Sequence, residues 1–436
     1  VYKRVLALYR TVVGENHPAV ARTLHNLAIV YQNLGQYPEA ERFYQKAIAV
    51  FTGSLGAVDG SVAASRLEYG LLLSELGRAD EAIKEAQAAL DVYMQLAETW
   101  GIQRAYATSS LGFALHRAGR LEEAIETFRA ATALMAKLRG EGSSDLPPGL
   151  TQLGEIYLKL GRLKESDASL ERAIAIREKD RAATPAGIAK SLAVLAQLRL
   201  KQGQPEEALA VARRYVGVTE ARLDIAQRAL SAAALGEQRV SRKLFEQFLE
   251  IARVNRPDEA LRAEMFQVAQ LPHISGTAAA VSRMAARFSA QLGTLATLVR
   301  ERQDAIERWQ VLDRQLTERL GGTQKGSASE AELRVRLSTL AEQIRRLDER
   351  LEHEFPDYAE LTNPRPVALD PAQRWLKPHE ALLLQVSTDT GTFVFWLRPG
   401  AARVVHTEMT KATLEHAVRS LREGLDLRRG NLSRPP

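Results

Sequence analysis

Apolar and polar residues alternate along the first half of the chain in a pattern that repeats. In the stretch NLGQYPEAERFYQKA, residues 33–47, Ala40 and Tyr44 follow a Leu-Gly turn at helical spacing. Leu24 and Leu27 show the same spacing before that turn. Each unit of the pattern therefore predicts two amphipathic helices joined by a glycine turn.

This frame occurs five times, with its turn glycines 42 residues apart and no insertion or deletion between them. Such a fixed period predicts a solenoid, in which each unit buries its apolar face against its neighbours. A small residue also recurs in every second helix, where we expect the two helices of a repeat to approach closely. The glycines are Gly35, Gly77, Gly119, Gly161 and Gly203, and the small residues are Ala40, Ala82, Ala124, Ser166 and Ala208.

Two units carry a family resemblance most clearly. The motif LGFAL is followed by Ala124 and Phe128, and LGEIY is followed by Ser166 and Leu170. These motifs resemble tetratricopeptide repeats, and the 42-residue unit resembles the long variety found in kinesin light chains and bacterial signalling proteins. The resemblance implies a mainly α fold with a right-handed solenoid over residues 1–220. Residues 1–13 match the second helix of a repeat without its first helix, so we expect the chain to be a fragment.

Beyond Val216 the 42-residue frame ends while the helical pattern continues. We expect residues 221–355 to form a helical extension, with an alanine-rich helix at 275–289 and two long helices on either side of a Gly/Ser-rich break. The second long helix carries apolar residues spaced 4, 3, 4, 3 and 4 apart, which predicts an antiparallel hairpin of coiled-coil type. These residues are Leu333, Leu337, Leu340, Ile344, Leu347 and Leu351.

Residues 365–436 have a different sequence pattern, in which prolines are followed by short apolar runs. The segments ALLLQVS, TFVFWLR and ARVVHTE predict three strands, and KATLEHAVRSLREGLDL predicts a helix. Three strands and one helix do not complete a domain. We therefore expect an incomplete sheet with an exposed edge and without the covering layer of a finished α/β domain.

The order of these parts carries a second resemblance. An alanine-rich GTAAAVSRMAARF helix, a long hairpin, FPDYAELTNPRPV, LKPHEALLLQV and GTFVFWLRPG follow the repeats. This order resembles the approach to a CHAT domain, a caspase-like domain found behind such repeats in bacteria. It implies a truncated α/β caspase-like domain at 365–436 and a parent cysteine peptidase with a His-Gly and a Cys. The chain contains no cysteine, and none of its eight histidines precedes a glycine, so no catalytic residue is assigned.

Composition narrows the remaining classes of function. The net charge is +6 with a pI near 9.4, but basic and acidic residues are interleaved and aromatic residues make up only 6%, which does not favour a nucleic-acid partner. No apolar run is long enough to span a membrane, and we expect a cytoplasmic protein. We expect no cofactor and no metal; His353 lies between two glutamates but belongs to the heptad helix.

The resemblance to tetratricopeptide repeats implies that the first helices line a concave groove for a protein or peptide partner. Three hypotheses stay open: the sensing and scaffolding segment of a CHAT-type peptidase, a stand-alone adaptor without enzyme activity, and, third in order, a solenoid that binds nucleic acid. The repeat frame gives these candidate partner-binding residues: Arg22, His25, Asn26, Gln32, Asn33, Tyr106, Ser109, His116, Arg117, Glu155, Lys159, Gln197 and Lys201.

Overall fold

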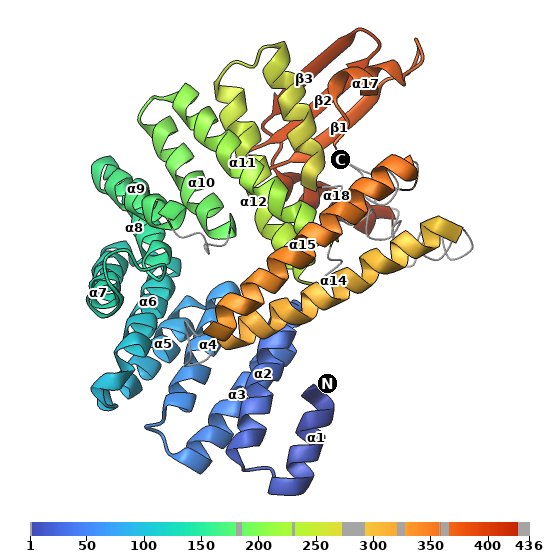
Figure 1. Cartoon of the computed structure of the whole chain (residues 1–436). Coiled ribbons are helices and arrows are strands. Elements are labelled where there is room, and N and C mark those ends of the chain that lie inside the picture. Colours follow the sequence, from blue (N-terminus) through green and yellow to red (C-terminus); the bar gives the residue numbers. More distant parts are fainter. Residues whose placement is uncertain are drawn as a thin grey trace. The chain divides into compact units, whose positions relative to one another are not determined.

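The computed structural model divides the chain into two compact units, Val1–Val218 and Thr219–Pro436, and each is described by itself. Both are mainly helical, and the second also contains a small sheet (Figure 1). The structure describes residues 2–179, 185–228, 232–272, 293–320, 328–356, 358 and 366–425.

The first unit is a solenoid of paired helices that follow one another in chain order (Figure 1). It begins with α1 (Tyr2–Val13), and a short 3-10 helix, η1 (Glu98–Trp100), precedes the third pair. The first helices of the five pairs are α2 (Pro18–Asn33), α4 (Gly60–Glu75), α6 (Gly101–Arg117), α8 (Pro147–Lys159) and α10 (Pro185–Lys201). The second helices are α3 (Tyr37–Leu55), α5 (Ala79–Gln95), α7 (Leu121–Arg139), α9 (Leu163–Lys179) and α11 (Pro205–Arg228).

The same glycine turn joins the two helices of every pair. Gly35 has a φ of +72°, in the left-handed region that a residue with a Cβ rarely adopts. Its N–H donates to the carbonyl of Gln32 at 2.9 Å, and the N–H of Gln36 donates to the carbonyl of Tyr31 at 2.9 Å. This pair of bonds is a Schellman motif, which satisfies carbonyls at the helix end. Both bonds and the positive φ recur at Gly77, Gly119, Gly161 and Gly203.

The predicted small residues lie where the two helices of a pair are closest. Ala40, Ala82, Ala124, Ser166 and Ala208 are all fully buried. The first helix of a pair also carries a small residue facing its second helix. Gly112 of α6 is an example, because a Cβ there would lie 3.1 Å from ring atoms of Phe128 in α7. Ser166 stays polar in this dry contact, since its hydroxyl donates to the carbonyl of Gly154 at 2.8 Å. The predicted close approach is confirmed.

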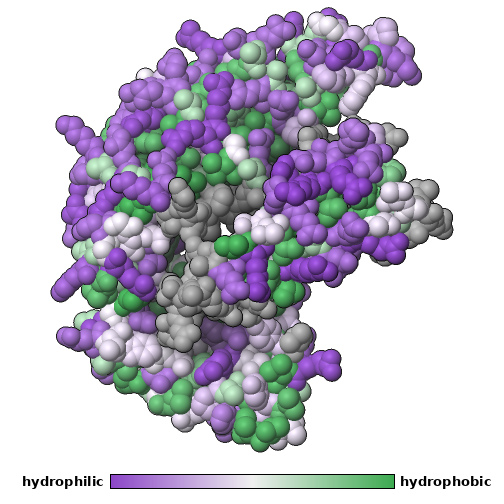
Figure 2. Space-filling model, in the orientation of Figure 1, coloured by the Kyte–Doolittle hydropathy of each residue, from purple (hydrophilic) through white to green (hydrophobic). Residues whose placement is uncertain are grey.

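The second unit contains a long helical hairpin. Its two helices, α14 and α15, pack through one apolar cluster that includes Leu298, Ile306, Ile344 and Leu347. An ion pair joins Arg302 to Asp348 across the hairpin at 2.6 Å, and both side chains are mostly buried. Hydrophilic residues cover much of the face of these helices that is visible in Figure 2. The helices of this unit are α12 (Ala232–Val254), a helix at 259–272, α14 (Gly293–Leu320), α15 (Ala328–Glu354), α17 (Leu369–Arg374) and α18 (Lys411–Leu425).

The three predicted strands form an antiparallel sheet in the order β1-β2-β3. The central strand β2 pairs Phe395 with Leu384 of β1 and with Val404 of β3. Pairing between neighbouring strands in sequence matches the turn signals that separate them. The strands are β1 (Leu382–Ser387), β2 (Thr392–Arg398) and β3 (Ala401–Thr407).

One face of the sheet is covered from within the second unit. Phe395 is buried, and its ring centroid lies 6.0 Å from that of Phe266 in the helix at 259–272. Leu383 and Val405 point to the other face and are 66% and 51% exposed. The expectation of a sheet without a covering layer is therefore wrong for one face, because a helix outside the strand region supplies that layer.

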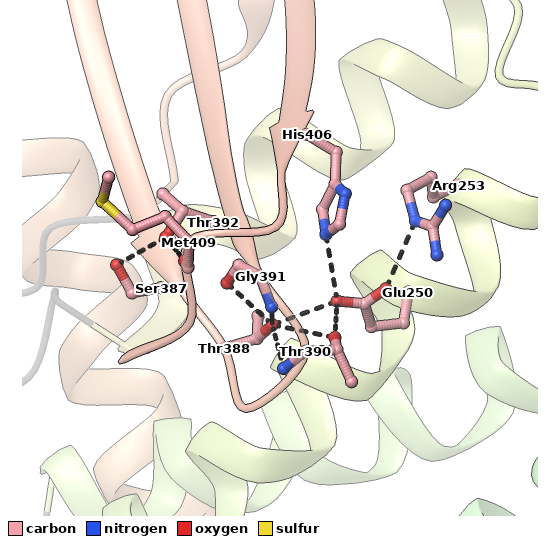
Figure 3. A network of polar contacts seen from close by, with 9 residues as sticks. All are labelled: Glu250, Arg253, Ser387, Thr388, Thr390, Gly391, Thr392, His406 and Met409. Atoms are coloured by element: carbon pink, nitrogen blue, oxygen red, sulfur yellow. Dashed lines mark hydrogen bonds and ion pairs between the residues drawn. The ribbon is translucent and has the colours of Figure 1, made fainter. Parts of the chain in front are cut away.

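A polar network fastens the β1–β2 turn to α12 (Figure 3). Thr388 and Thr390 both donate their hydroxyls to Oε1 of Glu250, the first at 3.0 Å. Nε2 of His406 lies 3.7 Å from the same oxygen. Gly391 completes the turn, since a Cβ there would lie 2.3 Å from the carbonyl oxygen of Thr407. No pattern in the sequence predicts this contact between a helix and the strand region.

Two predicted features fall on residues that the structure does not describe. These are the alanine-rich helix at 275–289 and the Gly/Ser-rich break, most of which lies at 321–327. Most of the FPDYAELTNPRPV segment at 355–367 also lies outside the described residues.

Candidate partner-binding face of the repeats

The first helices of successive repeats pack against one another, so that equivalent positions line up across the solenoid. One stripe of each first helix points away from its second helix. In α2 this stripe carries Arg22, Asn26, Ile29 and Asn33, none of which is fully buried. We call this stripe, together with its equivalents at multiples of 42 residues, the first-helix face.

Hydrogen bonds link neighbouring first helices at fixed positions of the frame. Nδ1 of His25 lies 3.1 Å from the hydroxyl oxygen of Ser65. Three repeats further on, the hydroxyls of Thr151 and Ser191 are 2.7 Å apart and buried. Both pairs join residues 40 positions apart, at equivalent places in the frame. Different side chains thus make the same link between repeats.

A second link joins residues 43 positions apart. Nε2 of Gln32 donates to Oε2 of Glu75 at 3.2 Å, and Nζ of Lys159 lies 2.7 Å from Nε2 of His116 at the equivalent place. An ammonium group can only donate, so Nε2 of His116 accepts and its proton resides on Nδ1. Nδ1 lies 3.1 Å from Oε1 of Gln152, to which it donates. His116 is thereby held neutral between two repeats.

The surroundings of His116 favour this neutral form. Burial lowers its pKa below the ordinary value of 6.5, and the nearby charges of Lys159 and Lys190 lower it further. The carboxylate of Glu155 acts in the opposite direction, at 3.9 Å from the imidazole and 3.4 Å from Nζ of Lys159. The cluster joins a mostly buried imidazole to an ammonium group that is half exposed on the first-helix face.

Two carboxylates lie on the same stripe of α4. Burial raises the pKa of Glu68, and the charge of Glu75 raises it further. Glu68 has no hydrogen bond or ion pair with any residue that the structure describes. Glu75 lies at the last residue of α4 and accepts only the amide of Gln32 among these residues.

A comparison with known families decides what these helices are. Residues 1–53, 61–137, 103–179 and 145–221 match the model of the tetratricopeptide repeat. The first unit consists of tetratricopeptide repeats. The match spans all five repeats and the partial one before them, as the sequence predicted.

Solved structures resemble part of the chain. A kinesin light chain of P. anserina with nearly identical TPR-like repeats is 23% identical, over 46% of this chain and 95% of that one, with a TM-score of 0.41. BtubC of P. vanneervenii is 20% identical, over 51% of this chain and 92% of that one, with a TM-score of 0.44. A Rap protein complexed with competence and sporulation factor is 16% identical, over 57% of this chain and 69% of that one, with a TM-score of 0.39. None of the curated proteins compared with the chain matches it.

The predicted partner-binding residues of the tetratricopeptide repeats fall into two groups. One group makes contacts: His25, Gln32, His116, Glu155 and Lys159 belong to the links between repeats, and Tyr106 donates to Asp145 at 2.9 Å. The other group makes no side-chain hydrogen bond or ion pair within the described part of the chain. Its members are Arg22, Asn26, Asn33, Ser109, Arg117, Gln197 and Lys201.

Several polar residues of the same face are not among the residues predicted from the sequence, namely Glu68, Glu75, Gln152 and Lys190. A signal was available, because Glu75 occupies the frame position of Arg117 and Lys159 in later repeats. The burial of Glu68 and the hydrogen bond of Gln152 could not be found in this way, since they depend on neighbouring helices.

The described residues contain neither a candidate metal site nor a candidate membrane-spanning helix. No group of three or more His, Cys, Asp or Glu there could hold a metal ion. Among the same residues, no helix is both long enough and apolar enough to cross a bilayer.

Proposed function

We propose that the tetratricopeptide repeats bind a segment of a protein partner along the first-helix face. The observation that carries the proposal is the set of polar side chains on this face that lack partners in the described chain. Arg117 is exposed at the end of α6, and Gln197 and Lys201 are exposed in the last two turns of α10. Solvated charges of this kind are available to the amides and carboxylates of a peptide at little desolvation cost.

The links between repeats support this role by making the face rigid. His25, His116 and Thr151 tie α2 to α4, α6 to α8 and α8 to α10 through side chains that cannot turn toward a ligand without breaking a hydrogen bond. A preorganised surface loses less conformational entropy on binding. The free polar groups between these links are therefore held at fixed spacing.

We further propose that this binding segment serves a CHAT-type caspase-like peptidase, in which partner binding repositions the C-terminal region. The order of parts behind the repeats supports this finer assignment, and the alternative is an adaptor without enzyme activity. The sequence of the parent protein discriminates the two. A His-Gly and a Cys within one domain length beyond residue 436 support the peptidase, and their absence supports the adaptor.

The binding proposal is tested by selecting peptides from a random display library on the full chain. Hydrogen exchange then maps the selected peptide. We expect slower exchange in α4, α6, α8 and α10 than in the second helices of the same repeats. Protection confined to α5, α7 and α9, or no enrichment of any peptide, would refute the proposal.

A further inference from the structure

The last turns of the first helices carry a row of side chains whose charge changes sign along the solenoid. Each lies two residues before a turn glycine, at the exposed end of its helix. The row is neutral in the first repeat, negative in the second and positive in the next three. Its members, in order, are Asn33, Glu75, Arg117, Lys159 and Lys201.

Helix stability explains the positive members but not the negative one. A cation in the last turn interacts favourably with the negative end of the helix dipole, as for Arg117, Lys159 and Lys201. Glu75 at the same place in α4 interacts unfavourably with that dipole. Burial raises the pKa of Glu68 on the same stripe, and repulsion from the charge of Glu75 raises it further. Neither Glu68 nor Glu75 forms an ion pair with a residue that the structure describes, and Glu75 accepts only the amide of Gln32.

The basic side chains of the first-helix face on α6 and α10 also lack ion-pair partners among the described residues. Arg117, Lys190 and Lys201 form no ion pair with a described residue, and all three are exposed. Lys159 has only Glu155 as an acidic neighbour, at 3.4 Å. From α6 to α10 the face is therefore net positive, while α4 is net negative.

We infer that the partner is a polypeptide segment with a basic side chain opposite α4 and an acidic stretch opposite α6, α8 and α10. This inference rests on the proposed function and adds the chemical class and the charge order of the partner. The two signs on one face set the order, since the reversed segment would bring like charges together at both ends. A nucleic acid does not fit, because its phosphates would oppose Glu68 and Glu75.

The test uses peptides selected on the full chain and four single-site variants. Glu75→Lys and Lys201→Glu each reverse the charge of one member of the row. Glu39→Lys and Lys164→Glu are matched controls, because these exposed residues lie on second helices and give the same changes in net charge. We expect each face variant to weaken binding of the selected peptide about tenfold, equivalent to about 1.4 kcal/mol, while both controls bind like the wild type.

Rescue gives the second readout. A peptide whose basic residue is changed to Glu should bind Glu75→Lys better than it binds the wild type, which a folding defect would not produce. If no peptide is enriched at all, the proposed function fails. If selected peptides bind but respond equally to face and control variants, or show no common charge order, binding along the repeats stands and the charge order is wrong.

Discussion

The substitution Gly119→Ala tests whether the left-handed turn, rather than any packing at the turn, holds each repeat together. Gly119 has a φ of +78°, and a Cβ added there meets no atom within 4 Å. The whole effect must then come from the backbone conformation. An alanine in the left-handed region costs about 1–2 kcal/mol, and its lower entropy in the unfolded chain offsets about 0.4–1 kcal/mol of this. We expect a net loss of about 1 kcal/mol.

Gly217→Ala is the matched control. Gly217 is exposed within α11, lies outside the left-handed region, and also has open space around its Cβ. An alanine in a helix interior is more favourable than glycine by about 0.5–1 kcal/mol. The same chemical change should therefore destabilise the protein at one site and stabilise it at the other.

Urea unfolding followed by circular dichroism measures both variants, with the slope compared to confirm that the same surface unfolds. Gly119→Asn adds a check, because asparagine tolerates the left-handed region better than alanine and should recover part of the loss. Equal stability of Gly119→Ala and wild type would refute the argument. So would a loss in Gly217→Ala as large as that in Gly119→Ala.

Four further outcomes are expected. Glu250→Ala should cost about 1–2 kcal/mol and speed hydrogen exchange in the β1–β2 turn, because two hydroxyls lose a charged acceptor, while exposed Glu259→Ala should do neither. Since the folded pKa of His116 lies below 6.5, stability should fall as pH drops through this value, and a wild-type-like fall in His116→Asn would contradict the assignment. Glu68→Gln should raise the melting temperature at pH 7, because half-burial and the charge of Glu75 both disfavour the ionised carboxylate in the folded protein; a lower melting temperature would count against an unpaired carboxylate. Ala124→Trp should cost about 3 kcal/mol or more by overpacking, and an unchanged melting temperature would show that the pair is not closely packed there.

The sequence predicts the solenoid well because its determinants are local and repeated. A glycine that must adopt a positive φ, such as Gly35, can be recognised from its position between two helical patterns. A small residue such as Ala40 can be recognised from its recurrence. The three strands were found for the same reason, since alternating apolar runs and turn residues are local signals.

What the sequence could not predict depends on contacts between segments far apart in the chain. The cover over Phe395 comes from Phe266, and the anchor of the β1–β2 turn comes from Glu250. On the first-helix face, the frame predicts which residues share a stripe but not which of them neighbouring helices bury. Glu68 was missed for this reason, because its place in the frame reads as an ordinary polar position until its burial is known.

The ion pair between α14 and α15 also decides how these two helices are aligned. The apolar residues of α15 repeat every seven positions, so a shift of the helix by seven residues returns one apolar residue to the place of another. Such a shift would put Ala341 or Phe355 in the place of Asp348 and leave Arg302 mostly buried without its carboxylate. Removing one partner of a buried pair costs about 3–5 kcal/mol, whereas the apolar contacts would change little. The pair therefore selects one alignment of the hairpin among those that its leucines alone would accept.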